Sequence, residues 1–199
     1  EKTIFSSIFT PCERIVCKVL HVQESEDMTW KQYLSSVFLF SGIGFVFLFL
    51  LQLLQGALPG NPQGLAGTSW HLAFNTAASF VTNTNWQSYS GESTLSYLTQ
   101  AVGLTVQNFV SAATGIAVLF ALIRGFTRVK AKGIGSFWVD MTRIVLHILI
   151  PLNLVLALLL VAGGVVQNLK PAEEVMLLEP VAVSASSEIL EDADIDLET

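Results

Sequence analysis

Hydrophobic runs separated by polar stretches divide the chain into predicted helices of two lengths. Residues 33–54 carry no charge, and their number is close to the ~20 residues that a helix needs to span the hydrocarbon of a bilayer. Residues 92–123 and 137–165 form two further predicted helices of sufficient length. The run 70–81 is apolar as well, but it is too short to cross. The pattern predicts an all-α integral membrane protein with about three transmembrane helices and one half-length helix.

The half-length helix leads directly into residues 82–90, a polar and uncharged stretch. Irregular backbone cannot face lipid, because each unpaired N–H or C=O group is costly there, so the stretch must be buried in protein or line a path filled with water. The carbonyl end of a helix carries partial negative charge, and the oxygens that follow it can be offered to a cation. We interpret residues 70–90 as a re-entrant pore helix with its pore loop. The fold is then a helix–pore loop–helix repeat.

The second long helix is unusually polar for a helix that faces lipid. Gln107, Ser111 and Thr114 fall on one stripe of it. Small residues four positions apart permit close approach of a neighbouring helix. These pairs are Ser111 with Gly115 and Ala113 with Ala117. We therefore expect this helix to be surrounded by protein or to line water.

Local sequence signals predict details at both ends of the chain. In the third long helix, Asp140 and Arg143 are spaced to form an ion pair near its start, and Pro151 is expected to bend it. Near the N-terminus, a capping box with Thr10 as N-cap and Pro11 at the first helical position predicts a short helix. Its apolar stripe suits a helix on the membrane surface, and a docking site for a partner subunit is the alternative.

The distribution of positive charge predicts the orientation. No Lys or Arg occurs between Gln32 and Ile123, so we expect the loop 82–90 on the external side and the basic residues on either side of this interval in the cytoplasm. Three crossings and one re-entrant loop satisfy this arrangement. The predicted segments are a cytoplasmic or interfacial stretch 1–31, a first helix–pore loop–helix repeat 32–125, a cytoplasmic basic loop 126–136, the first helix of a second repeat 137–165 and an external acidic loop or tail 166–199.

Composition agrees with a membrane protein. The chain is 52% hydrophobic and 13% charged, which is unusual for a soluble domain. A net charge of −6 argues against nucleic acid as a partner, which needs a basic face. The sequence has no Gly-rich phosphate loop, no His-Glu-x-x-His and no Asp-Lys-Thr-Gly string of the P-type pumps. We therefore expect no catalytic residues. We also expect no signal peptide, and we interpret Cys12 and Cys17 as free thiols.

Several stretches resemble one family. Residues 82–92, Thr-Asn-Thr-Asn-Trp-Gln-Ser-Tyr-Ser-Gly-Glu, are similar to the first selectivity-filter loop of the channel-like, potassium-binding subunit of the bacterial Kdp potassium-transporting P-type ATPase. Trp-Lys-Gln-Tyr-Leu at 30–34, Gly-Leu-Thr-Val-Gln-Asn-Phe at 103–109 and Ile-Ala-Val-Leu-Phe-Ala-Leu-Ile-Arg at 116–124 resemble that family as well. The resemblance covers most of the chain, from about residue 30 to residue 168.

The resemblance implies that this loop binds potassium in a potassium-channel-like fold. Dehydrating the ion requires several weak, neutral oxygen ligands at once. Thr82, Asn83, Thr84 and Asn85 supply such oxygens without formal charge, and Thr82, Asn83 and Thr84 are the expected potassium ligands. Gln87 matches a position at the filter mouth that the family uses in tuning ion affinity. In the family this loop is one of four non-identical loops around a central path.

Four other residues have a structural and a functional interpretation. Glu92 is either a favourable charge at a helix start or a vestibule group that attracts cations. Trp86 is interpreted as a packing or interfacial anchor rather than as an ion contact. His71 and His147 are interpreted as interfacial or hydrogen-bonded histidines rather than ligands, although an ionisable group inside a membrane helix is a functional candidate.

The resemblance implies a role in ATP-driven potassium uptake. The chain is interpreted as a fragment of the channel-like subunit, which binds potassium and translocates it selectively. Its expected partners are the ATP-hydrolysing P-type subunit, small accessory subunits and membrane lipid, in the bacterial cytoplasmic (inner) membrane. Potassium is the substrate, and no organic cofactor is expected. A lone repeat cannot close a pore, so this polypeptide by itself is expected neither to conduct nor to pump.

Three alternatives remain at this point. A Trk- or Ktr-like potassium uptake protein is built from similar repeats, but its filters centre on glycine, and residues 82–87 contain none. An intramembrane enzyme would use Glu92, His71 and His147, which the predicted topology keeps apart. A structural membrane subunit would have no ion site.

Overall fold

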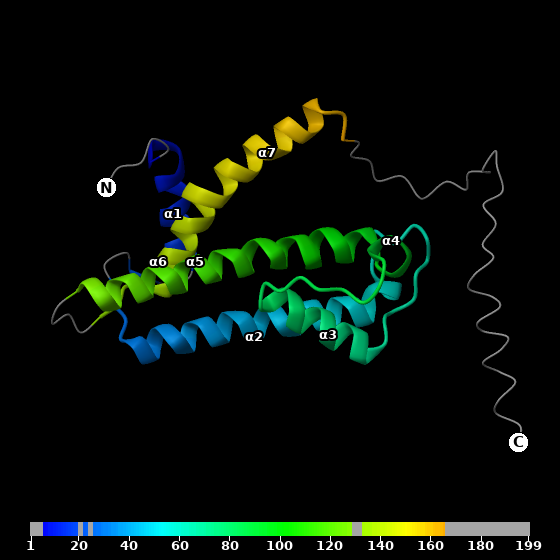
Figure 1. Ribbon diagram of the computed structural model, residues 1–199, viewed down its shortest axis with the longest axis horizontal. Coiled ribbons are helices and arrows are strands. Elements are labelled where there is room, and N and C mark those ends of the chain that lie inside the picture. The colour runs from blue at the N-terminus through cyan, green and yellow to red at the C-terminus, as the bar shows by residue number, and fades with distance from the viewer. Residues whose placement is uncertain (1–5, 20–21, 24–25, 129–132, 166–199) are drawn as a thin grey trace, which may run out of the picture.

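The computed structural model describes residues 6–19, 22–23, 26–128 and 133–165, and within these ranges every regular element is a helix. α3 and α4 are short, and the η2 and η3 segments are π-helical continuations of longer helices. Figure 1 shows the arrangement. The elements are α1 (Ser6–Val19), α2 (Trp30–Leu54), η1 (Gln55–Ala57), α3 (Trp70–Val81), α4 (Gly91–Thr94), η2 (Thr99–Thr105), α5 (Val106–Thr127), α6 (Phe137–Ile144), η3 (Val145–Leu149) and α7 (Ile150–Ala162).

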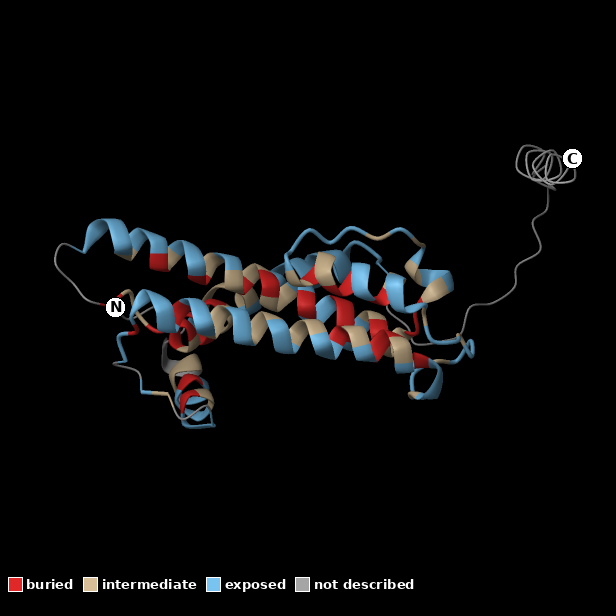
Figure 2. Cartoon of the chain, turned by 90° about the horizontal axis from the view of Figure 1, so that it is seen from below, coloured by how far each residue is buried: buried red, intermediate tan, exposed pale blue. Residues whose placement is uncertain are grey.

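Three continuous helices in the described part of the chain are long and apolar enough to cross a membrane: Trp30–Ala57, Thr99–Thr127 and Phe137–Ala162. This confirms the predicted all-α membrane architecture with three long helices. Much of their surface is exposed, as the pale colour of these helices in Figure 2 shows. In the apolar stretch of Phe137–Ala162, only 6% of the residues are buried. The outward faces of these helices therefore require lipid or further protein against them.

The second long helix differs from its predicted extent of 92–123. α4 stops at Thr94, Leu95 adopts an extended conformation, and the continuous helix that follows runs to Thr127. The interruption has a physical cause, because the Gln55 side chain takes over the hydrogen bonds that a continuing helix would make. Its Nε2 donates to Thr94 O at 2.9 Å, and its Oε1 accepts from Ser96 N at 3.1 Å.

The third long helix spans Phe137–Ala162, close to the predicted 137–165. A π-helical segment, Val145–Leu149, ends two residues before Pro151, and the bend expected at Pro151 stays a prediction. Proline has no N–H and cannot complete the regular helical ladder, so a wider turn before it is physically reasonable. Beyond this point α7 extends away from α2 and α5 (Figure 1).

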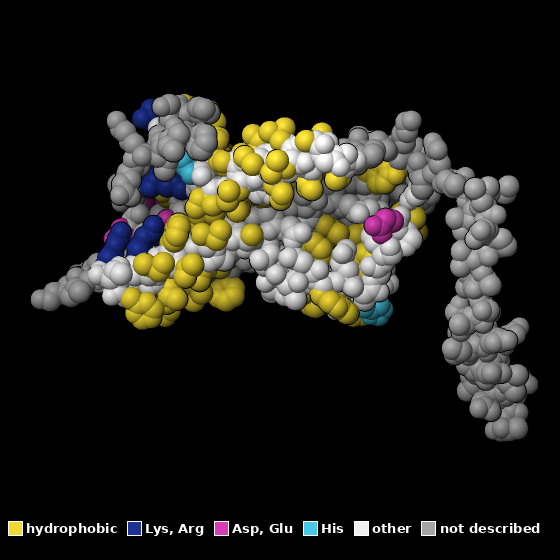
Figure 3. Space-filling view, turned by 45° about the horizontal axis from the view of Figure 1, so that its top comes forward, with side chains coloured by type: hydrophobic (Ala, Val, Ile, Leu, Met, Phe, Trp, Pro, Cys, Tyr) yellow, Lys and Arg dark blue, Asp and Glu magenta, His cyan; other side chains and the backbone are white. Residues whose placement is uncertain are grey.

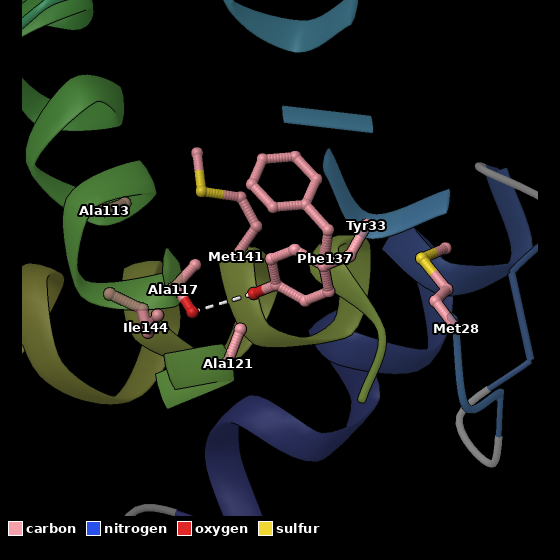
Figure 4. Close-up of a cluster of buried hydrophobic side chains, with 8 residues drawn as sticks. All are labelled: Met28, Tyr33, Ala113, Ala117, Ala121, Phe137, Met141 and Ile144. Carbon is pink, nitrogen blue, oxygen red and sulfur yellow. Dashed lines mark hydrogen bonds between the residues drawn. The ribbon is translucent and has the colours of Figure 1, made fainter. Parts of the chain in front are cut away.

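Two hydrophobic clusters hold the helices together. The first joins α2, α5 and α6 near the start of α2 and the end of α5 (Figure 4). Ala113 and Ala117 lie within it and are fully buried, which confirms their predicted role in close helix approach. Gly115 has open space beside it, so the predicted Ser111/Gly115 pair is not a contact. The second cluster joins α2, α3 and η2 and contains Leu48, Ala77, Phe80, Leu95 and Leu104.

The predicted ion pair between Asp140 and Arg143 is wrong. The Asp140 carboxylate instead accepts hydrogen bonds from both terminal nitrogens of Arg124, and the distance from Arg124 Nη2 to Asp140 Oδ1 is 2.7 Å. Arg143 pairs with Glu13 of α1. Neighbours in sequence on one helix turn point to different surroundings, and Arg124 reaches Asp140 because α5 packs against α6.

The predicted start of the N-terminal helix at Thr10 is also wrong. α1 begins at Ser6, and Pro11 lies inside it. The helix packs on α6 and η3, where the buried Glu13 carboxylate meets Arg143 and lies 3.6 Å from His147 Nε2. α1 is thus tied to the third long helix by charge as well as by apolar contacts.

Candidate functional site

The half-length helix α3 packs against α2 and runs antiparallel to it. At its start, Gln52 Nε2 of α2 donates to Ala73 O at 3.3 Å. Toward its end, Ala77 and Phe80 pack in one cluster with Leu48, which lies one turn earlier in α2. After α3 the chain returns alongside it to α4, so helix and loop enter and leave at the same end of the bundle (Figure 1).

The loop after α3 reverses the chain through two unusual backbone conformations. Asn83 and Asn85 both have φ of 58°. Left-handed backbone of this kind is uncommon for residues other than glycine, and asparagine tolerates it better than most. With left-handed residues alternating with ordinary ones, this short loop turns tightly without using glycine. Such conformations persist only where surrounding contacts enforce them.

The enforcing contacts come from the last turns of α3. Thr84 N and Asn85 N donate to Ser79 O at 2.9 and 3.2 Å, and Trp86 N donates to Ser79 Oγ at 2.6 Å. Thr82 Oγ1 lies 2.9 Å from Ala78 O and equally far from Thr84 Oγ1. The loop is therefore folded back onto the carbonyl end of its own helix.

This folding leaves oxygen atoms available. Among the described residues, none donates a hydrogen bond to the backbone carbonyls of Thr82, Thr84 or Asn85. The side chains of Thr82, Asn83, Thr84 and Asn85 are exposed. No charged group of the described chain forms an ion pair or hydrogen bond with them. The result is a concentrated set of neutral oxygens at the negative end of a helix dipole.

The loop is anchored to the middle of the second long helix. Ser111 Oγ lies 3.3 Å from Asn83 Oδ1, and Asn85 Nδ2 donates to the same oxygen at 3.2 Å. Ser111 lies near the middle of the helix Thr99–Thr127, so α3 and its loop reach about half the depth of a membrane-length helix. The predicted polar stripe of α5 is therefore directed toward protein, since Gln107 and Ser111 are both buried.

Within the described chain, the Gln87 side chain forms no hydrogen bond with the other four predicted filter residues. Its side chain is half-buried, and Nε2 donates to Tyr89 OH at 3.3 Å. The same hydroxyl accepts from Thr76 Oγ1 of α3 at 3.2 Å. Tyr89 thus fixes the returning segment, including the Gln87 side chain, to the side of α3. Trp86 is 57% exposed and makes no ring contact within the described chain, so its interpretation as an anchor is untested.

Glu92 lies in the first turn of α4 and is exposed. The Ser90 hydroxyl donates to Glu92 Oε2 at 2.6 Å, and this bond together with a backbone hydrogen bond holds the pKa of the carboxyl below its ordinary value. Ionised Glu92 is therefore favoured, consistent with a stabilising charge at a helix start. No contact in the described chain connects it to Thr82–Asn85.

The two histidines lie far from this loop and from each other. His71 is exposed and its ring centroid is 4.1 Å from that of Trp70. His147 belongs to η3 and approaches Glu13 of α1. Glu92, His71 and His147 therefore do not converge, which removes the geometric basis for an intramembrane enzyme built on them. Within the described ranges no three His, Cys, Asp or Glu side chains are grouped as a metal site.

Two buried glutamines, Gln52 and Gln55, hold the segments around α3 in place and were not singled out from the sequence. Gln52 and Gln55 are completely buried. Gln55 Nε2 donates to Ala66 O at 2.7 Å as well as to Thr94 O, which ties the loop after α2 to the end of α4. The signal available in the sequence was an amide residue inside an apolar run, because a buried amide must find hydrogen-bond partners.

Comparison with known proteins gives a consistent result. The family model described as "Potassium-transporting ATPase A subunit" (KdpA) matches residues 1–190. A potassium-transporting ATPase potassium-binding subunit of Clostridium perfringens is 61% identical over 189 residues, which covers 95% of this chain and 32% of that protein. The protein of the same name from Listeria welshimeri is 59% identical over 179 residues, covering 90% of this chain and 32% of that protein. The chain spans about a third of the length of these relatives.

Proposed function

The chain belongs to the KdpA family, the A subunits of potassium-transporting ATPases, and from that premise we propose that residues 82–87 form one part of a potassium-selectivity filter. The function is potassium binding and selective translocation, as the channel-like subunit of an ATP-driven uptake complex. This chain contributes one filter loop to it, with Thr82, Asn83, Thr84 and Asn85 as the groups nearest the ion and Gln87 at the mouth.

The observation that carries the proposal is the chemistry and depth of the loop. The carbonyls to which no described residue donates are neutral, and the contact between Asn83 and Ser111 fixes the loop near the middle of a membrane-length helix. Several weak neutral ligands replace the water shell of a monovalent cation while still allowing its release. The carbonyl end of α3 adds a favourable potential without adding a formal negative charge.

Charge distribution supports an external position for the loop. Lys and Arg gather at one end of the molecule, away from α4, as the dark blue side chains in Figure 3 show. Arg124 and Arg128 lie at the end of α5, and no Lys or Arg occurs from Gln32 to Ile123. By the positive-inside rule the basic end is cytoplasmic, and α3 with its loop dips into the bacterial inner membrane from outside.

ATP hydrolysis in this scheme belongs to another subunit. The sequence lacks the phosphate-binding and phosphorylation motifs of such an activity. The partners are an ATP-hydrolysing P-type subunit and small accessory subunits, with lipid around the exposed helices. Because the chain spans about a third of its relatives, it supplies one repeat and the opening helix of a second, and a pore requires the remaining repeats.

The proposal is tested on the full-length subunit assembled in its complex. Asn83→Ala and Gln87→Ala should each raise the potassium KM of ATPase activity, by about tenfold for Asn83, which corresponds to ~1.4 kcal/mol. Ser88→Ala is the matched control, since Ser88 is exposed in the same loop and has no hydrogen bond with the described residues. An unchanged KM in both variants would identify the loop as structural.

A further inference from the structure

We propose that Ser79 is the positioning residue that sets the shape of the loop 82–87 and thereby its discrimination between monovalent cations. The inference rests on the proposed function of that loop and adds a residue outside it. Ser79 lies in α3, within the apolar stretch Ala77–Ala78–Ser79–Phe80–Val81. Nothing in that local pattern distinguishes it from an ordinary small helical residue.

Among the described residues of α3, Ser79 forms the most hydrogen bonds with the loop. Its carbonyl accepts from Thr84 N and Asn85 N, and its hydroxyl oxygen accepts from Trp86 N at 2.6 Å. A helical serine usually turns its hydroxyl back to a carbonyl of the preceding turn. No such bond is made here within the described chain, and the hydroxyl oxygen serves the loop instead.

The hydrogen bond from Trp86 N to Ser79 Oγ closes a ring of the polypeptide chain that contains the candidate ligands. The carbonyls of Thr82, Thr84 and Asn85 all lie between residue 79 and residue 86, the two residues that this bond joins. The ring contains both left-handed residues, Asn83 and Asn85. Left-handed backbone is less favourable than ordinary backbone for any residue with a side chain, so both positions favour relaxation of the loop. The Ser79 hydroxyl opposes that relaxation at the point where the loop leaves the ring.

The two kinds of bond that Ser79 makes can be separated by substitution. Ser79→Ala retains the carbonyl that accepts from Thr84 and Asn85 but removes the only acceptor for Trp86 N in the described chain. The loop should remain in place but become less restricted. In a filter built from neutral ligands, discrimination depends on how many ligands are presented and in what geometry. A less restricted loop therefore weakens selection between ions of different size more than it affects turnover.

The experiment measures potassium- and rubidium-stimulated ATPase activity of the complete complex in proteoliposomes. For Ser79→Ala we expect the potassium KM to rise about fivefold to tenfold, in the range of a lost hydrogen bond. The ratio of rubidium to potassium KM should move toward one, and kcat should change by less than about twofold. Ser79→Thr retains the acceptor oxygen and should restore both KM and the ratio. Ser88→Ala should match the wild type.

The outcomes separate this inference from the function on which it rests. If Asn83→Ala raises the potassium KM while Ser79→Ala leaves both KM and the ion ratio unchanged, the role of Ser79 is refuted and the filter proposal stands. If neither variant changes KM, the filter proposal itself fails. A parallel fall in kcat and thermal stability, with an unchanged ion ratio, would assign Ser79 a purely structural role. Should Ser79→Ala fail to assemble, Ser79→Cys, of similar size and with a weaker acceptor, must show the same altered ratio or the inference is overturned.

Discussion

Around Asp140 the helices α2, α5 and α6 are joined by charge, whereas around Ser79 the short helix and its loop are joined by neutral hydrogen bonds. Arg124 binds Asp140 through both terminal nitrogens, and Tyr33 OH lies 3.1 Å from Asp140 Oδ2 and 2.8 Å from Ala117 O. The Tyr33–Ala117 bond is drawn in Figure 4. At the other site, every hydrogen bond that the loop makes with the described residues involves amide, hydroxyl or backbone groups.

The difference indicates that formal charges suit permanent helix junctions in a membrane protein but not a loop that binds an ion reversibly. A buried carboxylate needs a charged partner, and the resulting pair is difficult to separate, which suits a permanent junction between helices. A loop that must bind a cation and release it cannot contain such a group, because the ion would be held too tightly. Substitutions in the charged junction should therefore lower mainly the unfolding free energy, whereas substitutions in the loop should change mainly the potassium KM.

The largest effect is expected from breaking the charged junction. Asp140→Asn leaves Arg124 without its partner in a mostly buried position, and a loss of about 3 kcal/mol in unfolding free energy follows. Denaturant titration of the full-length subunit in detergent measures this loss. Arg128→Gln is the control, because both side chains of the Arg128–Asp27 pair are exposed and its loss should cost less. The potassium KM of correctly folded Asp140→Asn complex should be unchanged, and a raised KM with normal stability would contradict the division between the two regions.

The Gln55 side chain joins segments by neutral hydrogen bonds, and its replacement should cause the second-largest loss of unfolding free energy. Gln55→Leu leaves the Ser96 amide and the Thr94 and Ala66 carbonyls without their hydrogen bonds, at a cost of about 2 kcal/mol. The same titration tests this, with the exposed Gln63→Leu as the matched control. Equal stability of the two variants would show that the amide of Gln55 is not required.

A smaller effect is expected from the left-handed backbone of the loop itself. Asn85→Gly keeps the conformation available, whereas Asn85→Val opposes φ of 58° by roughly 1–2 kcal/mol. The potassium KM should therefore rise about tenfold more for valine than for glycine. Similar KM values for the two variants would mean that the backbone conformation does not determine ion binding.

The smallest effect concerns the exposed acid beyond the loop. Ser90→Ala removes the hydrogen bond to Glu92 and should move the pKa of this carboxyl upward, toward its ordinary value. Because the pKa is depressed in the folded protein, the interaction stabilises fully above the ordinary pKa of a glutamate. It is lost as the pH falls through the depressed value. A carboxyl-carbon NMR titration of the subunit measures the shift, and Ser88→Ala should leave it unchanged.

Periodicity and composition were sufficient for the architecture. Three membrane-length helices, the half-length helix Trp70–Val81 and the neutral stretch after it are properties of contiguous residues, so hydropathy and length reveal them. The break before η2 was missed because its cause, the Gln55 side chain, lies 39 residues before Thr94 in the chain. The start of α1 was misplaced because the capping pattern at Thr10 lies inside a helix that already begins at Ser6.

What the chain alone determined is therefore which segments can enter a membrane and which residues offer neutral oxygens there. Only the tertiary structure decided which groups meet. Asp140 binds Arg124, 16 residues away, rather than Arg143, and Asn83 meets Ser111, 28 residues away. Helix formation depends on near neighbours, whereas hydrogen-bond and ion-pair partners depend on how distant helices pack. The loop composition thus predicts a cation site, whereas the hydrogen bonds between Ser79 and the loop are seen only in the folded chain.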